Sequence, residues 1–132
     1  MRVLGIDVGT KRVGLALGDT DSRVASPLAT IEAEDAQKQI VQLIGIEEIK
    51  LVVVGMPHPL QGDRGVPGEA ERMVASFIDQ LKGRIKIPVV TEDERFSTDA
   101  ARALIGPRGK DRDAVAASVI LQGYFDRHFS SH

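Results

Sequence analysis

The sequence predicts an α/β domain in which three strands come first and strands then alternate with helices. Three observations support this prediction. The chain opens with short apolar runs separated by turn residues, which is typical of antiparallel strands. Its middle contains continuous apolar runs separated by a segment of helical periodicity, which is typical of parallel strands covered on both faces. No internal repeat, low-complexity tract or linker interrupts residues 1–132, so a single domain is expected.

The first three strands are predicted at residues 3–8, 13–17 and 24–31. The first two runs flank Gly9-Thr10-Lys11-Arg12, a turn-like insert, and this arrangement predicts a β-hairpin. The third run contains Pro27, which cannot donate a backbone hydrogen bond and therefore indicates a bulge or an edge position. Short links between the runs favour an antiparallel start to the sheet.

Helices and strands alternate in the middle of the chain. Apolar residues recur at helical spacing over residues 34–44, and the Val-rich run 49–54 predicts a strand buried on both faces. Residues 55–68 contain four glycines and three prolines and are predicted to form a loop. Residues 70–81 place their apolar side chains on one helical face, and residues 85–90 predict another strand.

The last third of the chain is predicted to be mainly helical. Ser97 or Thr98 can cap a short helix that runs to residue 104, and residues 113–125 predict a last helix that is buried on most sides. In the strand predicted at residues 85–90, Pro88 is expected to disturb the hydrogen bonding to its neighbour. Because β–α–β units give parallel strands with right-handed crossovers, the central strands are expected at residues 3–8, 51–54 and 87–90.

Composition removes several classes of protein. The chain has no cysteine, which excludes disulfides and thiolate sites, and its three histidines are too scattered to predict a histidine-built metal site. Its 19 acidic and 17 basic residues give a net charge of −2, so a polyanion would have to be held by a local patch or through metal ions. No apolar run reaches the ~20 residues that cross a bilayer. Asp7 interrupts the stretch that a signal peptide needs, so a cytoplasmic protein is expected.

Acidic side chains occur at three places where they could carry chemistry. Asp7 interrupts the first strand, where a carboxylate is costly unless it binds a cation, pairs with a basic residue of the following turn, or faces solvent. The acidic residues in 91–95 follow a predicted strand, which is where open α/β sheets place their sites, although a solvated turn explains them too. Asp111 and Asp113 open the last helix, where capping and the helix dipole already favour them.

Convergence of these carboxylates in one cleft would predict a metal centre. Clusters that contain only carboxylate oxygens suit Mg²⁺ or Mn²⁺. Two such ions can stabilise the attacking and leaving oxygens when a phosphodiester is cleaved. They would also explain how an acidic protein holds a polyanion.

Motifs that cover almost the whole chain, in order, resemble those of the YqgF/RuvX family. They are an opening hairpin, a central strand with a glycine loop, an acidic motif and a last helix. In this sequence they read Gly5-Ile6-Asp7-Val8-Gly9-Thr10-Lys11-Arg12-Val13-Gly14-Leu15-Ala16, Val53-Val54-Gly55-Met56-Pro57 with Gly62 and Gly65, Glu92-Asp93-Glu94-Arg95-Phe96-Ser97-Thr98 with Ala101-Arg102, and Asp113-Ala114-Val115-Ala116-Ala117 through Ile120-Leu121.

The resemblance implies an RNase H-like fold related to Holliday-junction resolvases, with a five-stranded sheet whose second strand is antiparallel to the rest. It implies a nuclease that processes the 5′ end of pre-16S ribosomal RNA, with Mg²⁺ or Mn²⁺ held by Asp7, Glu94 and Asp113. The expected partners are nucleic acid, RNA before DNA, and pre-ribosomal particles. The alternatives are a DNA or Holliday-junction nuclease, a non-catalytic ribosome-associated binding module, and an actin-like ATPase or sugar kinase. The short chain and the absence of a Walker A motif argue against the ATPase.

The chain departs from the family pattern in three ways. Only residues 103–112 separate Arg102 from Asp113, where the family has a longer segment that faces the substrate. Arg112 precedes Asp113 where an apolar residue is usual, which leaves Asp111 as a rival metal ligand. His58-Pro59 replaces the usual apolar-Asn pair of the glycine loop.

Several basic or polar residues are candidates for contacts with the substrate. An arginine can clamp a phosphate through two hydrogen bonds, and a basic cluster can contact a nucleic-acid backbone. Each candidate can also be a solvated surface residue. The candidates are Thr10, Lys11, Arg95, Arg108, Lys110 and Arg112.

Overall fold

A computed structural model describes residues 1–57, 68–93 and 109–129, and the side chains of the last helix from Arg112 onward. Strands and helices follow one another in the predicted order along the chain. The elements are β1 (Arg2–Val8), β2 (Arg12–Asp19), β3 (Val24–Glu32), the 3₁₀ helix η1 (Ala33–Asp35), α1 (Ala36–Ile46), β4 (Ile49–Met56), α2 (Glu69–Lys82), β5 (Val89–Asp93) and α4 (Gly109–His128).

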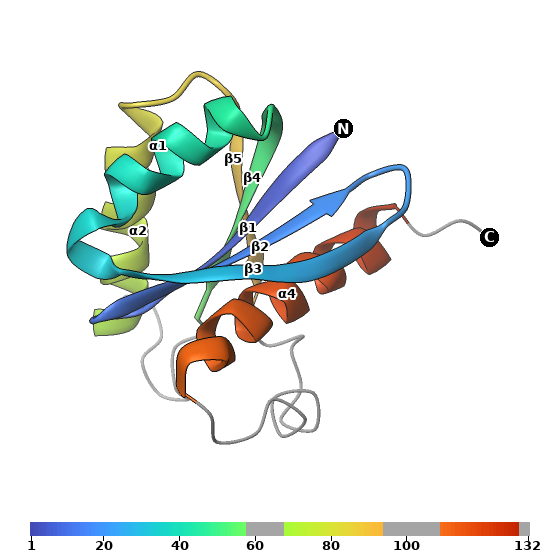
Figure 1. Cartoon of the computed structure of the whole chain (residues 1–132). Coiled ribbons are helices and arrows are strands. Elements are labelled where there is room, and N and C mark those ends of the chain that lie inside the picture. The colour runs from blue at the N-terminus through green and yellow to red at the C-terminus, as the bar shows by residue number, and fades with distance from the viewer. Residues whose placement is uncertain (58–67, 94–108, 130–132) are drawn as a thin grey trace.

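The strands form one five-stranded sheet in the order β3-β2-β1-β4-β5 (Figure 1). β2 pairs antiparallel with both β1 and β3, whereas β1, β4 and β5 are parallel. The short turn between β1 and β2 permits an antiparallel hairpin, while the longer connections through helices bring β4 and β5 back in the parallel sense. The five-stranded sheet with an antiparallel second strand is therefore confirmed.

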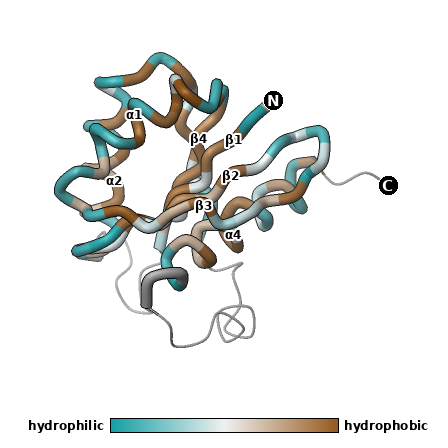
Figure 2. Tube along the Cα trace, viewed as in Figure 1, coloured by the Kyte–Doolittle hydropathy of each residue, from teal (hydrophilic) through white to brown (hydrophobic). Residues whose placement is uncertain are grey.

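Helices cover both faces of the sheet. α1 and α2 lie over one face and α4 crosses the other (Figure 1). Successive side chains of a strand point to opposite faces, so Leu4 and Ile6 of β1 join the cluster under α1 and α2, whereas Val3 joins the cluster under α4. The hydrophobic residues concentrate along β1 and β4 (Figure 2). These strands lie in the middle of the sheet and are buried on both faces.

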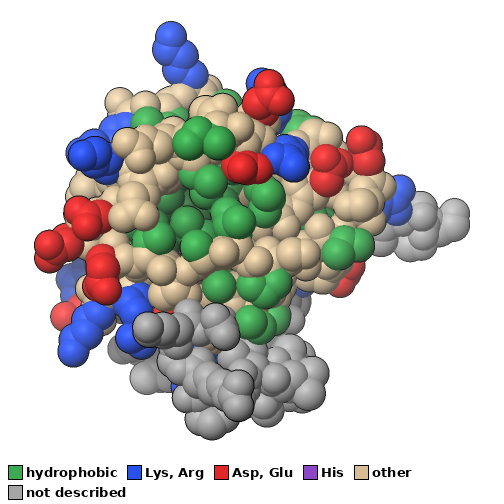
Figure 3. Space-filling model, in the orientation of Figure 1, with side chains coloured by type: hydrophobic (Ala, Val, Ile, Leu, Met, Phe, Trp, Pro, Cys, Tyr) green, Lys and Arg blue, Asp and Glu red, His purple; other side chains and the backbone are tan. Residues whose placement is uncertain are grey.

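The core predicted from the Val-rich run 49–54 and from the apolar face of residues 70–81 is confirmed. Val52 and Val54 are fully buried, and the side chain of Leu81 on α2 is buried against the same cluster. In the orientation of Figure 1, hydrophobic side chains also gather in a hollow near the middle of the face, with most charged side chains around it (Figure 3). Pro27 lies on β3, an edge strand, next to a register shift between β2 and β3, as its chemistry predicts.

The prediction for β5 was wrong in its start and in its place. The strand begins at Val89 rather than at residue 85 or 87, because Pro88 has no amide hydrogen; the carbonyl of Pro88 instead accepts a hydrogen bond of 3.0 Å from Val52. β5 is also an edge strand of the described sheet, not a central one. It continues through Asp93, so residues 91–93 belong to the strand rather than to a turn.

The ends of the last helix were also misplaced. α4 begins at Gly109, four residues before the predicted start, and ends at His128. The predicted short helix from Ser97 or Thr98 lies outside the described residues, as does most of the predicted loop 55–68. Within the described part of the chain, no helix is both long and apolar enough to cross a membrane.

Candidate active site

Asp7 lies near the end of β1 on the face that α4 covers. Val3, earlier on the same strand, packs under α4, and the alternation of side chains places Asp7 on the same side. The side chain of Asp7 is half-buried. Its antiparallel partner on β2 is Gly14.

Gly14 brings the first turns of α4 against this part of the sheet. A Cβ atom at Gly14 would lie only 1.8 Å from the carbonyl oxygen of Asp113, so no other residue permits this approach. Directly opposed residues of an antiparallel pair share one face of the sheet, with Cβ positions about 5 Å apart. The structure therefore brings Asp7 and the backbone of Asp113 to the same face and the same edge of the sheet, although they lie near opposite ends of the chain.

Asp113 forms an ion pair with the first residue of β2. The Nε atom of Arg12 donates a hydrogen bond to Oδ2 of Asp113 at 3.1 Å. The Arg12 side chain is 52% exposed, so the pair contributes at most about 1 kcal/mol to stability. Its consequence is geometric, because a carboxylate held at one oxygen keeps a fixed orientation for its other oxygen.

The third predicted ligand, Glu94, lies outside the described residues. β5 ends at Asp93, the residue before it, which stands in register with Met56 of β4. Within residues 1–57, 68–93 and 109–129, no three acidic, histidine or cysteine side chains gather closely enough to hold a metal ion. The metal centre predicted from Asp7, Glu94 and Asp113 thus remains a prediction that includes one undescribed residue.

The structure describes the side chains of three of the six predicted substrate contacts. Thr10 and Lys11 are exposed in the turn between β1 and β2, and Arg112 is exposed one residue before Asp113. Arg95 and Arg108 lie outside the described residues. The backbones of Lys110 and of the rival ligand Asp111 belong to α4, but their side chains are not among those described.

Glu92 is a buried acidic residue whose role the sequence did not reveal. Its side chain is only 5% exposed and forms an ion pair with Arg127 of α4, while His128 Nε2 lies 3.9 Å from the other carboxylate oxygen. Burial lowers the pKa of the Arg127 guanidinium. A buried carboxylate requires such a partner, so this contact ties the last turn of α4 to β5. The alternation of β5 past Val90 is the only signal in the sequence that points to it.

The sequence comparisons identify the family. The family model of RuvX, described as a Holliday junction resolvase, matches residues 1–127. The chain belongs to the RuvX family.

Curated RuvX relatives share more than a third of its residues. A protein of Chloroflexus aurantiacus, named "Putative pre-16S rRNA nuclease", is 39% identical over 98% of this chain and 89% of its own length. A protein of Caldanaerobacter subterraneus with the same name is 39% identical over 99% of this chain and 100% of its own length. The similarity therefore extends over nearly the full length of both relatives and of this chain.

Solved structures support the RNase H-like fold expected of a RuvX protein. RuvC of T. thermophilus, solved in complex with a Holliday junction substrate, superposes with a TM-score of 0.62 over 96% of this chain and 94% of RuvC. The structure of T. thermophilus RuvC alone gives a TM-score of 0.61. Sequence identity in both is 14%, so these similarities describe the fold.

Proposed function

We propose that this chain is a metal-dependent nuclease that hydrolyses phosphodiester bonds of RNA and processes the 5′ end of pre-16S ribosomal RNA. The observation that carries the proposal is the contact of Asp113 with Gly14, which places Asp113 beside the cross-strand partner of Asp7. The names of the RuvX relatives support the choice of ribosomal RNA. Such a role would place the protein in the cytoplasm, in contact with pre-ribosomal particles.

Asp7 and Asp113 suit a hard divalent cation. Both are aspartates at one edge of the sheet, and their donors are carboxylate oxygens, the ligands that Mg²⁺ and Mn²⁺ prefer. With Glu94 they would hold one or two such ions, which when bound stabilise the charge on the attacking and leaving oxygens of a phosphodiester. The metal would also offset the repulsion between these carboxylates and an RNA phosphate.

Neighbouring residues have supporting roles in this proposal. Arg12 fixes the orientation of the Asp113 carboxylate through its 3.1 Å hydrogen bond. Thr10 and Lys11, exposed in the turn that follows Asp7, are placed to contact phosphates of a strand that passes this edge. Arg95, Arg108, Lys110 and Arg112 are the further candidates for such contacts.

The test is cleavage of a labelled RNA that spans the mature 5′ end of 16S rRNA. We expect cutting with Mg²⁺ or Mn²⁺ and none with EDTA, and no turnover of ATP. A four-way DNA junction belongs in the same assay, because the RuvX family is described as a Holliday junction resolvase. If only the junction is cut, the substrate is DNA rather than RNA. If RNA is bound but not cut, a non-catalytic binding module is favoured.

The basic residues before Asp113 should govern the salt dependence of RNA binding. Replacing Arg108, Lys110 and Arg112 together by Ala removes up to three cations that can bind phosphates. The slope of log K against log salt should then become shallower by about 0.7 for each phosphate that is no longer neutralised on a single strand. The matched control replaces the exposed Lys50, Lys82 and Lys86, which lie elsewhere, and should leave the slope unchanged. Equal slopes for the two triple variants would show that this cluster does not bind RNA.

A further inference from the structure

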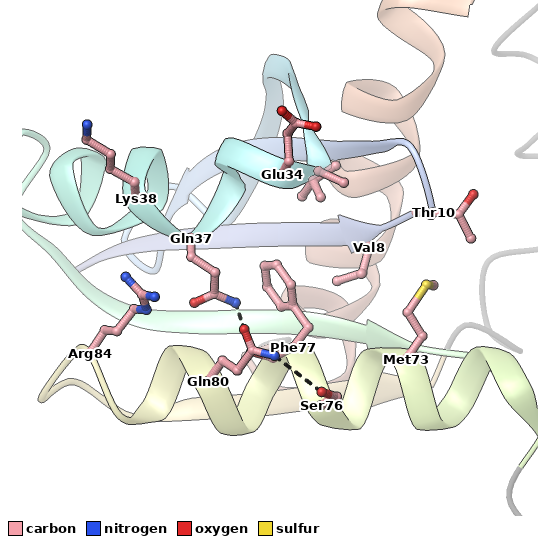
Figure 4. A pocket seen from close by; sticks show the side chains of 13 residues that line it. Val8, Thr10, Glu34, Gln37, Lys38, Met73, Ser76, Phe77, Gln80 and Arg84 are labelled. Atoms are coloured by element: carbon pink, nitrogen blue, oxygen red, sulfur yellow. Dashed lines mark hydrogen bonds between the residues drawn. The ribbon is translucent and has the colours of Figure 1, made fainter.

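A cavity of about 520 Å³ lies on the face of the sheet opposite Asp113. Its walls come from η1 and α1 on one side and from α2 on the other, and the end of β1 contributes Val8 and Gly9 (Figure 4). This volume is within the range of small-molecule and nucleotide sites. No sequence pattern predicted the cavity, because its walls come from segments far apart in the chain.

The cavity reaches the same end of the sheet as the candidate active site, which is the end where β1 turns into β2. Val8, Gly9 and Thr10 line it, and they follow Asp7 directly in the chain. Asp7 points to one face of β1 and Val8 to the other, so the turn between β1 and β2 separates the two sites. A strand of nucleic acid that crosses this turn can contact both.

The lining combines an aromatic wall with polar amides. Phe77 and Met73 of α2 lie on one side of the cavity, with Gln37 of α1 opposite (Figure 4). Nε2 of Gln37 donates a hydrogen bond of 3.1 Å to the carbonyl of Phe77, which fixes the orientation of the amide. Oε1 of Gln37 is then a buried acceptor that has no hydrogen-bond partner among the described residues. Buried acceptors ordinarily have a donor, and the N–H groups on the edge of a nucleobase are such donors.

Two cations lie at the end of the cavity away from Thr10. Lys38 of α1 and Arg84, which follows α2, both line this end and are exposed (Figure 4). Among the described lining residues, the one acidic side chain is that of Glu34, which is also exposed and leaves this end with a net positive charge. An aromatic wall next to a positively charged end is the arrangement that binds a base and its phosphate in single-stranded nucleic acid.

We propose that this cavity binds one unpaired nucleotide of the RNA substrate, with its base against Phe77 and its phosphate between Lys38 and Arg84. The proposal rests on the proposed function and adds to it a substrate class, because a base within a duplex cannot enter the cavity. Single-stranded RNA should therefore bind more tightly than duplex RNA.

The test measures binding to a fluorescent single-stranded A10 RNA by anisotropy, with the full chain in excess EDTA so that no cleavage occurs. Phe77→Leu keeps an apolar side chain but removes the ring, and should weaken binding about tenfold. The double variant Lys38→Gln and Arg84→Gln should make the salt slope shallower by about 0.7, because the one phosphate between these two side chains is no longer neutralised. The matched control is Lys50→Gln with Lys82→Gln, two exposed lysines outside the cavity, and should bind like the wild type.

The outcomes separate this proposal from the proposed function. Tighter binding of A10 than of duplex RNA, together with the effects of both variants, supports the cavity whether or not the protein cleaves RNA. The side chains of Lys38 and Arg84 are exposed and not needed for folding, so their double variant should fold. If this variant binds A10 with wild-type affinity and a wild-type salt slope, the cavity proposal is overturned even if cleavage is observed. Competition by free AMP at the affinity of A10 would assign the cavity to a free nucleotide and also overturn it.

Discussion

Asp7→Asn and Asp113→Asn are each expected to abolish metal-dependent cleavage while leaving the fold intact, and Glu94→Gln is expected to do the same. The amide has nearly the shape of the carboxylate but no charge, so it releases the divalent ion and keeps its packing. The measurement is single-turnover cleavage of the labelled RNA, together with circular dichroism of each variant. Asp111→Asn is the matched control and should retain most activity.

The same variants should separate metal binding from catalysis. Metal at 100 times its dissociation constant stabilises a protein by about 2.7 kcal/mol, and this gain should be present in the wild type and reduced in Asp7→Asn. In EDTA, Asp7→Asn should melt slightly higher, because it removes repulsion between carboxylates. The rise should be small, since Arg12 already offsets the charge of Asp113. If Asp7→Asn retains cleavage, the nuclease proposal is refuted. If cleavage is abolished in Asp111→Asn but kept in Asp113→Asn, then Asp111 is the metal ligand in place of Asp113.

Gly14→Ala should have the second-largest effect, although it changes no charged group. Its new Cβ would lie 1.8 Å from the carbonyl oxygen of Asp113, a backbone atom that can move only if the start of α4 moves away from the sheet. Overpacking of this kind costs about 1–3 kcal/mol. We expect a lower melting temperature and, in addition, loss of the stabilisation by Mg²⁺ or Mn²⁺, because Asp113 moves away from Asp7.

Gly45→Ala provides the matched control for that substitution. Gly45 lies within α1, and a Cβ there would meet no atom of the described residues within 4 Å. The substitution should stabilise the protein by about 0.5–1 kcal/mol, since glycine is unfavourable inside a helix. Gly14→Ala with a wild-type melting temperature and metal response would mean that the contact with Asp113 does not hold the site together.

The sequence predicted those parts of the fold that depend on local pattern. The β1–β2 hairpin followed from two apolar runs around Gly9-Thr10-Lys11-Arg12, and the buried β4 followed from the Val-rich run 49–54. Both signals are contained within a few neighbouring residues. The α2 helix was predicted within one residue at each end, because its apolar side chains recur with helical spacing over its whole length.

The features that the sequence did not predict depend on distant parts of the chain. Glu92 reads as part of an acidic turn until Arg127, at the far end of α4, is placed over it. Gly14 reads as one more hairpin residue until the backbone of Asp113 is seen against it. Pro88 was expected to disturb a strand, but only its hydrogen bond to Val52 shows that the strand starts after it.

The contact of α4 with Gly14 also bears on when activity can arise during protein synthesis. The N-terminal part of a chain leaves the ribosome first, and a domain generally folds as a unit. Asp7 and Gly14 emerge early, but α4 emerges last and must close a long loop to reach them. A nascent chain that has made only its strands and first helices therefore carries half of the carboxylate pair, and the proposed cutting activity can begin only when α4 has been translated and docked.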